Sequence, residues 1–526
     1  NLNLNLNLNL NLNLNLNLNL NLNLNFVLGE LKMSKKVRAN KALDRDLKSR
    51  TYFEGAAAEQ KRQLLAPSLA FAFILISGLV VTAVLGWNAQ SIIIIFAAAI
   101  GAYMALNIGA NDVANNVGPA VGANAVTMLG ALIIAAIFET AGALIAGGDV
   151  VGTISKGIID PKLVSHPPTF IWAMFAALLA AALWVNLATW VGAPVSTTHS
   201  IVGGVMGAGI MAAGLTAVNW PKMAQIAASW VISPLLGGII AALFLWLIKS
   251  QVSDKDDKIG AANRWVPLLV AIMAGAFATY LSIKGIKKII KIDLQTALII
   301  GLVALGICYL IVKPLIRRQS EGMENTKKSI RELFKIPLIC AAALLSFAHG
   351  ANDVANAVGP LAAIVHTVEA GEVVAKVSIP LWVMGIGAFG LSFGLLLFGP
   401  KLIRMVGEKI TKLNPLRAYC VALSAAITVI IASWLALPVS STHIAVGAVF
   451  GVGFFREFHW RMTANKKDVI ALKEKEIVKA DTKKRVHRKL VRRSHFLTII
   501  AAWVITVPAA AILSGSLFVL LNSLFS

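Results

Sequence analysis

Charged residues are scarce in this chain. Asp, Glu, Lys and Arg make up 14% of its 526 residues, whereas a soluble domain has roughly 25%. Only three cysteines are present, Cys308, Cys340 and Cys420, and each lies in an apolar run without metal-ligand spacing. We interpret them as small buried hydrophobic side chains. A Walker-type Gly-Lys-Ser/Thr loop is also missing, so the chain itself is not expected to hydrolyse ATP.

Apolar residues take the place of charge. They form 57% of the chain, and the mean hydropathy is +0.76. Many runs reach the roughly 20 apolar residues that a helix needs to span a bilayer, which predicts an all-α polytopic membrane protein with about 12–13 transmembrane helices. The thirteen candidate crossings are residues 68–86, 91–110, 125–147, 169–190, 194–217, 223–248, 265–283, 295–316, 336–351, 379–399, 416–436, 438–455 and 497–522.

Much of the net charge of +23 is concentrated in two loops. Residues 34–62 hold nine Lys/Arg and four acids, and residues 456–495 hold fourteen Lys/Arg and five acids. Both loops flank apolar runs, and basic loops of this kind stay in the cytoplasm. We therefore expect a multi-pass protein of the cell membrane (the inner membrane, in a bacterium) with a cytoplasmic N-terminus. The lipid bilayer explains the charge without a nucleic-acid partner.

Two stretches of the chain are nearly identical. One is Gly-Ala-Asn-Asp-Val-Ala-Asn-Asn-Val-Gly-Pro at residues 109–119, and the other is Gly-Ala-Asn-Asp-Val-Ala-Asn-Ala-Val-Gly-Pro at residues 350–360. Each ends an apolar run, where an Asp costs roughly 2.5–3.5 kcal/mol on insertion scales. The copies lie seven predicted crossings apart, an odd number, so we expect two inverted-topology repeats with helices broken at Gly and Pro.

A second motif is also duplicated. Pro-Val-Ser-Thr-Thr-His at residues 194–199 recurs as Pro-Val-Ser-Ser-Thr-His at residues 438–443. Pro suits the first turn of a helix and Ser or Thr suits its N-cap, while the Gly-rich run that follows permits a re-entrant helix. A helix that begins inside the membrane directs free N–H groups and hydroxyls into the protein. This motif therefore predicts an anion site built from neutral donors.

The Asn-Asp motif offers the opposite chemistry. Its carboxylate and carboxamide oxygens, with the carbonyls that Gly and Pro release, suit a hard cation, and the absence of a Cys/His cluster favours Na⁺ or H⁺ over a transition metal. Asn111 and Asn352 are further candidates, as is Glu139, an acid inside the third predicted crossing. The alternative role for such polar residues is to join helices, at ~0.6 kcal/mol per bond. His349 is discounted, because Ile108 holds the matching place in the first copy.

The two duplicated motifs, with Phe138-Glu139-Thr140 and the stretch from Gly152 to Asp160, resemble the inorganic phosphate transporter (PiT) family of sodium- or proton-coupled carriers. The resemblance covers roughly residues 91–248 and 336–520. It implies phosphate bound at Ser196, Thr197, Thr198, Ser440, Ser441 and Thr442, and Na⁺ bound at Asp112, Asn115, Asp353 and Asn356. No cofactor is implied beyond the coupling ion.

These observations divide the chain. Residues 1–33 contain an Asn-Leu alternation that we interpret as a low-complexity, artefactual tail. We expect a basic segment with an extra helix at 34–90, a first transport repeat at 91–248, a connector with two transmembrane helices at 249–335, and a second repeat at 336–526 that carries the basic insertion 456–495. The alternatives are H⁺-coupled phosphate transport, a sulfate permease, and a membrane-embedded hydrolase using Ser196 or Ser440. A homodimer stays open.

The positive loops generate a topology prediction. A cysteine introduced at Lys479 should react with a membrane-impermeant thiol reagent only after cells are permeabilised, because fourteen Lys/Arg in residues 456–495 resist translocation. Labelling in intact cells would reverse the predicted orientation of every segment.

Overall fold

A computed structural model describes residues 64–160, 163–164, 166–191, 195–285, 292–373, 379–409, 413–472 and 493–525. Within these residues the chain is helical apart from turns and one isolated β-bridge between Ile159 and Val218. The expected tail at 1–33, the basic segment up to residue 63, Pro194 and residues 473–492 of the basic insertion lie outside the described residues.

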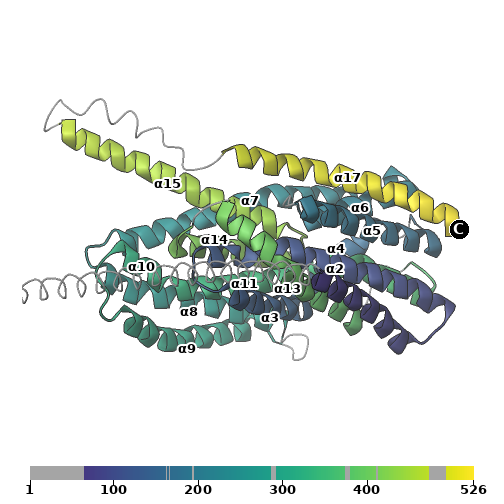
Figure 1. Ribbon diagram of the computed structural model, residues 1–526, viewed down its shortest axis with the longest axis horizontal. Coiled ribbons are helices and arrows are strands. Elements are labelled where there is room, and N and C mark those ends of the chain that lie inside the picture. The colour runs from purple at the N-terminus through teal and green to yellow at the C-terminus, as the bar shows by residue number, and fades with distance from the viewer. Residues whose placement is uncertain are drawn as a thin grey trace, which may run out of the picture. The chain divides into compact units, whose positions relative to one another are not determined.

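A helix at Leu64–Leu85 precedes the others. The elements that follow, shown in Figure 1, are α2 (Ala89–Gly122), α3 (Met128–Ala146), α4 (Gly148–Lys156), α5 (Pro167–Val191), α6 (Thr197–Ala213), η1 (Leu215–Ala217), α7 (Trp220–Ile248), η2 (Lys249–Ser253), α8 (Lys258–Lys284), α9 (Leu294–Ser320), α10 (Lys327–Leu333), α11 (Lys335–Asp353), α12 (Ala355–Ala370), α13 (Leu381–Lys409), α14 (Pro415–Trp434), α15 (Ser441–Leu472) and α17 (Arg493–Phe525).

Eleven helices of the described residues are long and apolar enough to cross a membrane. The prediction of thirteen crossings is wrong for the runs 194–217 and 438–455. Each of these runs begins a helix at a buried Ser/Thr stretch rather than at a membrane surface. Helix α6 has 17 residues, about 26 Å at 1.5 Å per residue, so it falls short of a bilayer core about 30 Å thick. The apolar part of α15 likewise ends at Phe455.

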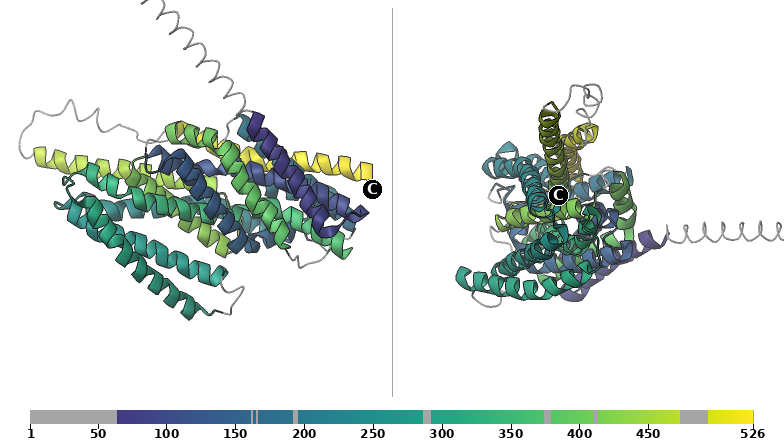
Figure 2. Two further views of the ribbon diagram at one scale, coloured as in Figure 1. Left: turned by 60° about the horizontal axis from the view of Figure 1, so that its bottom comes forward. Right: turned by 90° about the vertical axis from the view of Figure 1, so that its left-hand side faces the viewer.

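The revised count removes one argument for inverted repeats. The two Asn-Asp stretches fall on the second and eighth of the eleven helices. The number of crossings between them is then even, so the count alone no longer predicts opposite orientations. In the segment predicted to be a connector, α8 and α9 are two candidate crossings that pack on each other. Figure 2 shows them as a hairpin at one side of the bundle.

The predicted helix breaks at Gly and Pro do not occur in either stretch. Helix α2 runs through Gly109 and Pro119, and α12 runs through Gly359 and Pro360, without interruption. Helices α11 and α12 are separated only by Val354, whose backbone is helical. Proline still acts in both copies. Because Pro119 and Pro360 have no N–H, the carbonyls of Asn115 and Asn356, four residues earlier, lose their helical donor. Each copy therefore retains a backbone oxygen without that bond.

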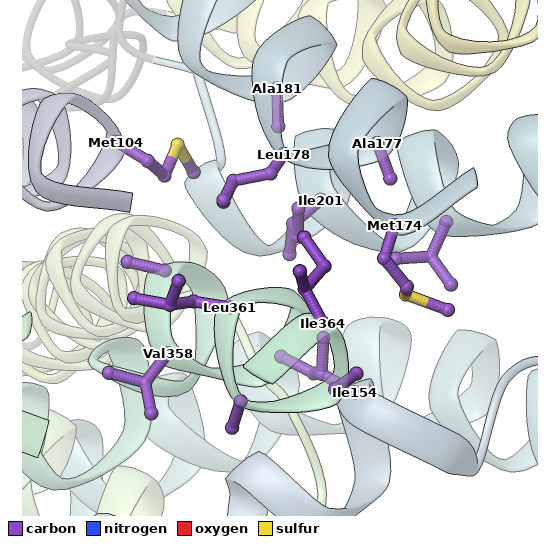
Figure 3. Packing of buried hydrophobic residues seen from close by; sticks show 14 of the residues in the cluster. Met104, Ile154, Met174, Ala177, Leu178, Ala181, Ile201, Val358, Leu361 and Ile364 are labelled. Carbon is purple, nitrogen blue, oxygen red and sulfur yellow. The ribbon is translucent and has the colours of Figure 1, made fainter. Parts of the chain in front are cut away.

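Two apolar cores flank the Asn-Asp stretches. The part of α2 before its Asn-Asp pair lies in one core and the part after it lies in the other. Helix α11 belongs to this second core and α12 to the first. In Figure 3 the first core joins residues of α12, such as Leu361 and Ile364, to Leu178 and Ile201 of α5 and α6. The two copies thus pass between the same cores in opposite directions, which supports the predicted inversion.

The helices that follow each copy pack reciprocally. Helix α17 of the second copy covers α5 and α6 of the first, and α7 of the first covers α14 and α15 of the second (Figure 1). Glycines allow the closest approaches. Gly109 lies against the backbone carbonyl of Leu391 in α13, and Gly350 against that of Glu139 in α3, so a Cβ at either position would overlap the carbonyl. The same contact is therefore made once by each copy.

These contacts predict how stability responds to substitution. Gly109→Ala and Gly350→Ala should each lower the free energy of unfolding by about 1–3 kcal/mol, because the added methyl forces two helices apart. Gly306→Ala in α9 is the control, since a Cβ there meets nothing within 4 Å. Thermal unfolding of the purified protein in detergent measures all three. Equal stability of Gly109→Ala and Gly306→Ala would contradict the close packing.

Candidate functional site

The two Asn-Asp stretches meet between the apolar cores. Asp112 and Asp353 are each 1% exposed, so neither carboxylate has solvent to stabilise its charge. A buried charge of this kind needs compensating hydrogen bonds or counter-charges. The side chains that surround the pair come from α2, α6, α11, α12 and α15.

Asp112 is bonded to both Ser/Thr motifs. Its Oδ2 accepts a hydrogen bond of 2.9 Å from Thr197, and its Oδ1 accepts one of 2.9 Å from Thr442. Thr197 begins α6 and Thr442 lies in the first turn of α15. One carboxylate therefore joins the starts of two helices that are far apart in the sequence.

The neighbouring residues extend this junction. Asn115 donates to Thr442 at 2.8 Å, and Asn356 donates to Thr197 and Thr198 at 3.3 and 3.1 Å. Each Asn thus reaches the hydroxyl motif of the other copy. Asp353 accepts from Ser441 at 3.2 Å, as Asp112 does from Thr197.

Serine caps the two helix starts. Ser196 Oγ accepts the backbone N–H of His199 at 3.1 Å, and Ser440 Oγ accepts that of His443 at 3.3 Å. Both starts point into the buried centre, where the positive end of a helix dipole favours an anion. The rings of His199 and His443 lie against each other, with centroids 4.5 Å apart.

Asn111 and Asn352 occupy equivalent supporting positions. The Asn111 amide is hydrogen-bonded to the Thr189 hydroxyl of α5 at 2.9 Å, and Asn352 donates to Ser433 of α14 at 2.9 Å. Asn352 also accepts the backbone N–H of Val439 at 3.3 Å. These contacts fix the helix that precedes each Ser/Thr motif and so position the motif itself.

Glu139 enters the centre from α3. It is fully buried and accepts a hydrogen bond from Asn116 at 2.8 Å. Its Oε1 lies 3.1 Å from His349 Nδ1, and His349 Nε2 lies 3.0 Å from Asp353 and 3.8 Å from Asp112. His349 is thus in contact with three carboxylates, and ligand atoms of Asp112, His349 and Asp353 lie within 4.8 Å of one another.

The structure therefore gathers all the predicted site residues, namely Ser196, Thr197, Thr198, Ser440, Ser441, Thr442, Asp112, Asn115, Asp353, Asn356, Asn111, Asn352 and Glu139. Asn116 and His349 also lie at this centre, although neither is among the predicted site residues. The signal was present, because His349 and Asp353 are four residues apart and share a helix face. A comparison of the two copies does not reveal His349, because the equivalent position in the first copy is Ile108.

Known proteins match this arrangement. A family model described as "Phosphate transporter family" matches residues 108–514. The chain belongs to the phosphate transporter family. A Helicobacter pylori protein named "Putative phosphate permease" is 45% identical to this chain, over 91% of this chain and 99% of the relative. A Pyrococcus abyssi protein with the same kind of name is 37% identical, over 80% of this chain and 96% of the relative.

A solved structure of the family is similar in fold. The chain called "The sodium-dependent phosphate transporter" superimposes with a TM-score of 0.72 at 35% identity, covering 82% of this chain and 100% of that one. The family identifies this protein as an integral membrane phosphate transporter, which confirms the resemblance drawn from the duplicated motifs.

Glu139 provides the first test of the centre. Glu139→Gln keeps an oxygen that can accept from Asn116 but replaces the carboxyl group that lies 3.1 Å from His349 with an amide. Phosphate uptake should fall more than about tenfold, or about 1.4 kcal/mol. Glu369→Gln, an exposed acid near the end of α12, is the matched control and should transport normally. Normal uptake by Glu139→Gln, at equal protein level, would exclude Glu139 from the working site.

Proposed function

We propose that this protein is a symporter that couples phosphate transport to Na⁺. The observation that carries the proposal is the shared carboxylate of Asp112, which accepts hydroxyl hydrogen bonds from both Ser/Thr motifs. A cation at this carboxylate and an anion at those helix starts would be direct neighbours. Their charges would then compensate each other in a site closed to water.

Phosphate would bind between the starts of α6 and α15. The donors there are the first-turn N–H groups and the hydroxyls of Ser196, Thr197, Thr198, Ser440, Ser441 and Thr442. Neither Ser/Thr motif and neither Asn-Asp stretch contains Lys or Arg. The anion therefore depends on neutral donors and on the coupled cation for its stabilisation.

Na⁺ would bind to oxygen atoms of the Asn-Asp stretches. Each copy offers a carboxylate, at Asp112 or Asp353, and a carboxamide, at Asn115 or Asn356. The backbone carbonyls of these two Asn residues add further oxygens, because proline removed their helical donors. Hard cations prefer such ligands. The threonine hydroxyls now bonded to Asp112 would then be released toward the anion.

The fold offers a way to expose this site to either side. The α5–α6 pair is covered by α17, and the α14–α15 pair by α7. Related repeats of opposite orientation can rock about a central site so that one entrance closes as the other opens. The hydrogen bonds between Asn115 and Thr442, and between Asn356 and Thr198, link the two moving halves.

The two serines named for the hydrolase alternative have another role. Ser196 and Ser440 both serve as caps for the backbone N–H three residues later. A catalytic serine would instead bond to the side chain of a base. The remaining alternatives are H⁺-coupled phosphate transport and a sulfate permease. They differ from the proposal in the coupling ion or in the anion, and the transport experiment below distinguishes them.

The experiment is uptake of radiolabelled phosphate into proteoliposomes with and without an inward Na⁺ gradient. We expect uptake only with the Na⁺ gradient, and no competition from sulfate, which lacks the P–O–H donor that a buried acceptor such as Asp112 or Asp353 requires. Uptake driven by a proton gradient alone would transfer the proposal to H⁺ coupling. Equal competition by sulfate would indicate a sulfate permease.

The same assay tests the cation ligands. Asp112→Asn and Asp353→Asn should each abolish Na⁺-driven uptake while the protein still inserts and folds, because each Asp is the main negative charge of its copy. Asp256→Asn, an exposed acid between η2 and α8, serves as the control. Wild-type uptake by both central variants would reject the assignment of Asp112 and Asp353 as cation ligands.

A further inference from the structure

A large groove lies among α7, α15 and α17, and none of the six residues proposed to bind phosphate lines it. It has a volume of about 1110 Å³, slightly above the roughly 300–1,000 Å³ of ligand pockets. Its inner end is formed by the rings of His199, His443 and Trp230. Apart from these rings the lining is apolar, and four phenylalanines of α15 line one wall: Phe450, Phe454, Phe455 and Phe458.

The groove opens sideways along helices that face the bilayer. Val231, Leu235 and Val504, which line it, are 71%, 63% and 67% exposed. They belong to α7 and α17, both of which are long and apolar enough to cross the membrane. A ligand that reaches this groove must therefore come from the lipid phase, which favours a hydrocarbon chain over a water-soluble compound.

Basic side chains gather at the opposite end from the histidines. Lys249, at the end of α7, lies within electrostatic range of Lys327, Arg417 and Arg456. Arg417 is in turn within range of Arg331 and Arg456. We call Lys249, Lys327, Arg331, Arg417 and Arg456 the cationic cluster. Acids near the cluster include Asp254, whose carboxylate lies 3.9 Å from Lys249, and Glu332 and Glu457, which directly follow Arg331 and Arg456 in the sequence.

The groove and the cationic cluster are continuous. The ring of Phe455, which lines the groove, contacts the ring of His459 at 5.9 Å between centroids. Lys249 Nζ lies 2.9 and 3.0 Å from the two ring nitrogens of His459. Arg456 directly follows Phe455 in α15. A ligand with an apolar tail and an anionic head would thus find both of its partners along one path.

We propose that this groove is a binding site for an anionic phospholipid of the surrounding bilayer, with acyl chains between α7 and α17 and the headgroup phosphate on Lys249 and Arg456. Charge complementarity commits the site to an anionic headgroup, since the cluster holds more cations than acids and basic residues near a membrane surface attract anionic lipids. The proposal does not depend on which ion drives transport.

The bound lipid would also support the contact between the two repeats. Gly447 and Gly451 of α15 pack on the backbone of Pro234 and Gly238 in α7, and all four residues line the groove. Acyl chains would fill the space beside this crossing. Because a ligand that binds only the folded state raises its stability, the lipid should raise the melting temperature of the purified protein.

The test is a titration of delipidated protein in detergent with phosphatidylglycerol or phosphatidylcholine, followed by native mass spectrometry and thermal unfolding. We expect phosphatidylglycerol to bind at least about tenfold more tightly, or about 1.4 kcal/mol. The double variant Lys249→Gln/Arg456→Gln should bind both lipids alike. Lys222→Gln, at the other end of α7, is the matched control and should keep the preference.

A second variant separates the groove from the headgroup contact. Ala242→Phe places a ring in the groove and should weaken both lipids while phosphate binding confirms that the protein is folded. Equal affinity of the wild type for the two lipids would overturn the anionic site. A preference that survives Lys249→Gln/Arg456→Gln, or lipid binding unchanged by Ala242→Phe, would place the lipid elsewhere and equally overturn the proposal.

Discussion

A carboxylate buried among apolar helices must be stabilised by groups that the protein brings to it, and Asp112 receives them from both halves of the chain. Thr197 and Thr442 donate to its two oxygens. These residues begin α6 and lie in the first turn of α15, the two helices too short in their apolar part to cross the bilayer. The short apolar parts of these helices and the burial of Asp112 have one explanation, because both helices must begin beside the same buried carboxylate.

The symmetry around that point is incomplete, and the exceptions are polar. In the register that aligns Asp112 with Asp353, His349 corresponds to Ile108 and Asn116 to Ala357. The glycine contacts likewise place Glu139 opposite Leu391. The polar group formed by Asn116, Glu139 and His349 therefore draws on both copies, and its counterpart under the repeat symmetry, formed by Ala357, Leu391 and Ile108, is apolar. The two Asp residues have different surroundings, so the two proposed cation sites should be unequal.

The long apolar runs allowed the membrane class to be predicted. The duplicated motifs indicated which polar residues gather at the buried centre, because Asp and Asn are costly in a membrane unless they have a role. The hydrophobic pattern does not show whether a helix begins at the membrane surface or inside the protein. It therefore predicted full crossings for α6 and α15. A search for residues shared by both copies also could not find His349, whose partner Glu139 comes from another helix. Hydrogen bonds such as that from Asn356 to Thr198 depend on tertiary packing, which sequence spacing does not encode.

The central claim is that the anion and the cation bind as neighbours in one junction and stabilise each other. Isothermal titration of phosphate into the purified protein, at Na⁺ concentrations from zero to saturation, tests it most directly. The account predicts that phosphate affinity rises at least about tenfold, or about 1.4 kcal/mol, and that phosphate raises Na⁺ affinity by the same factor, as linkage requires. Phosphate affinity that is independent of Na⁺ would contradict it.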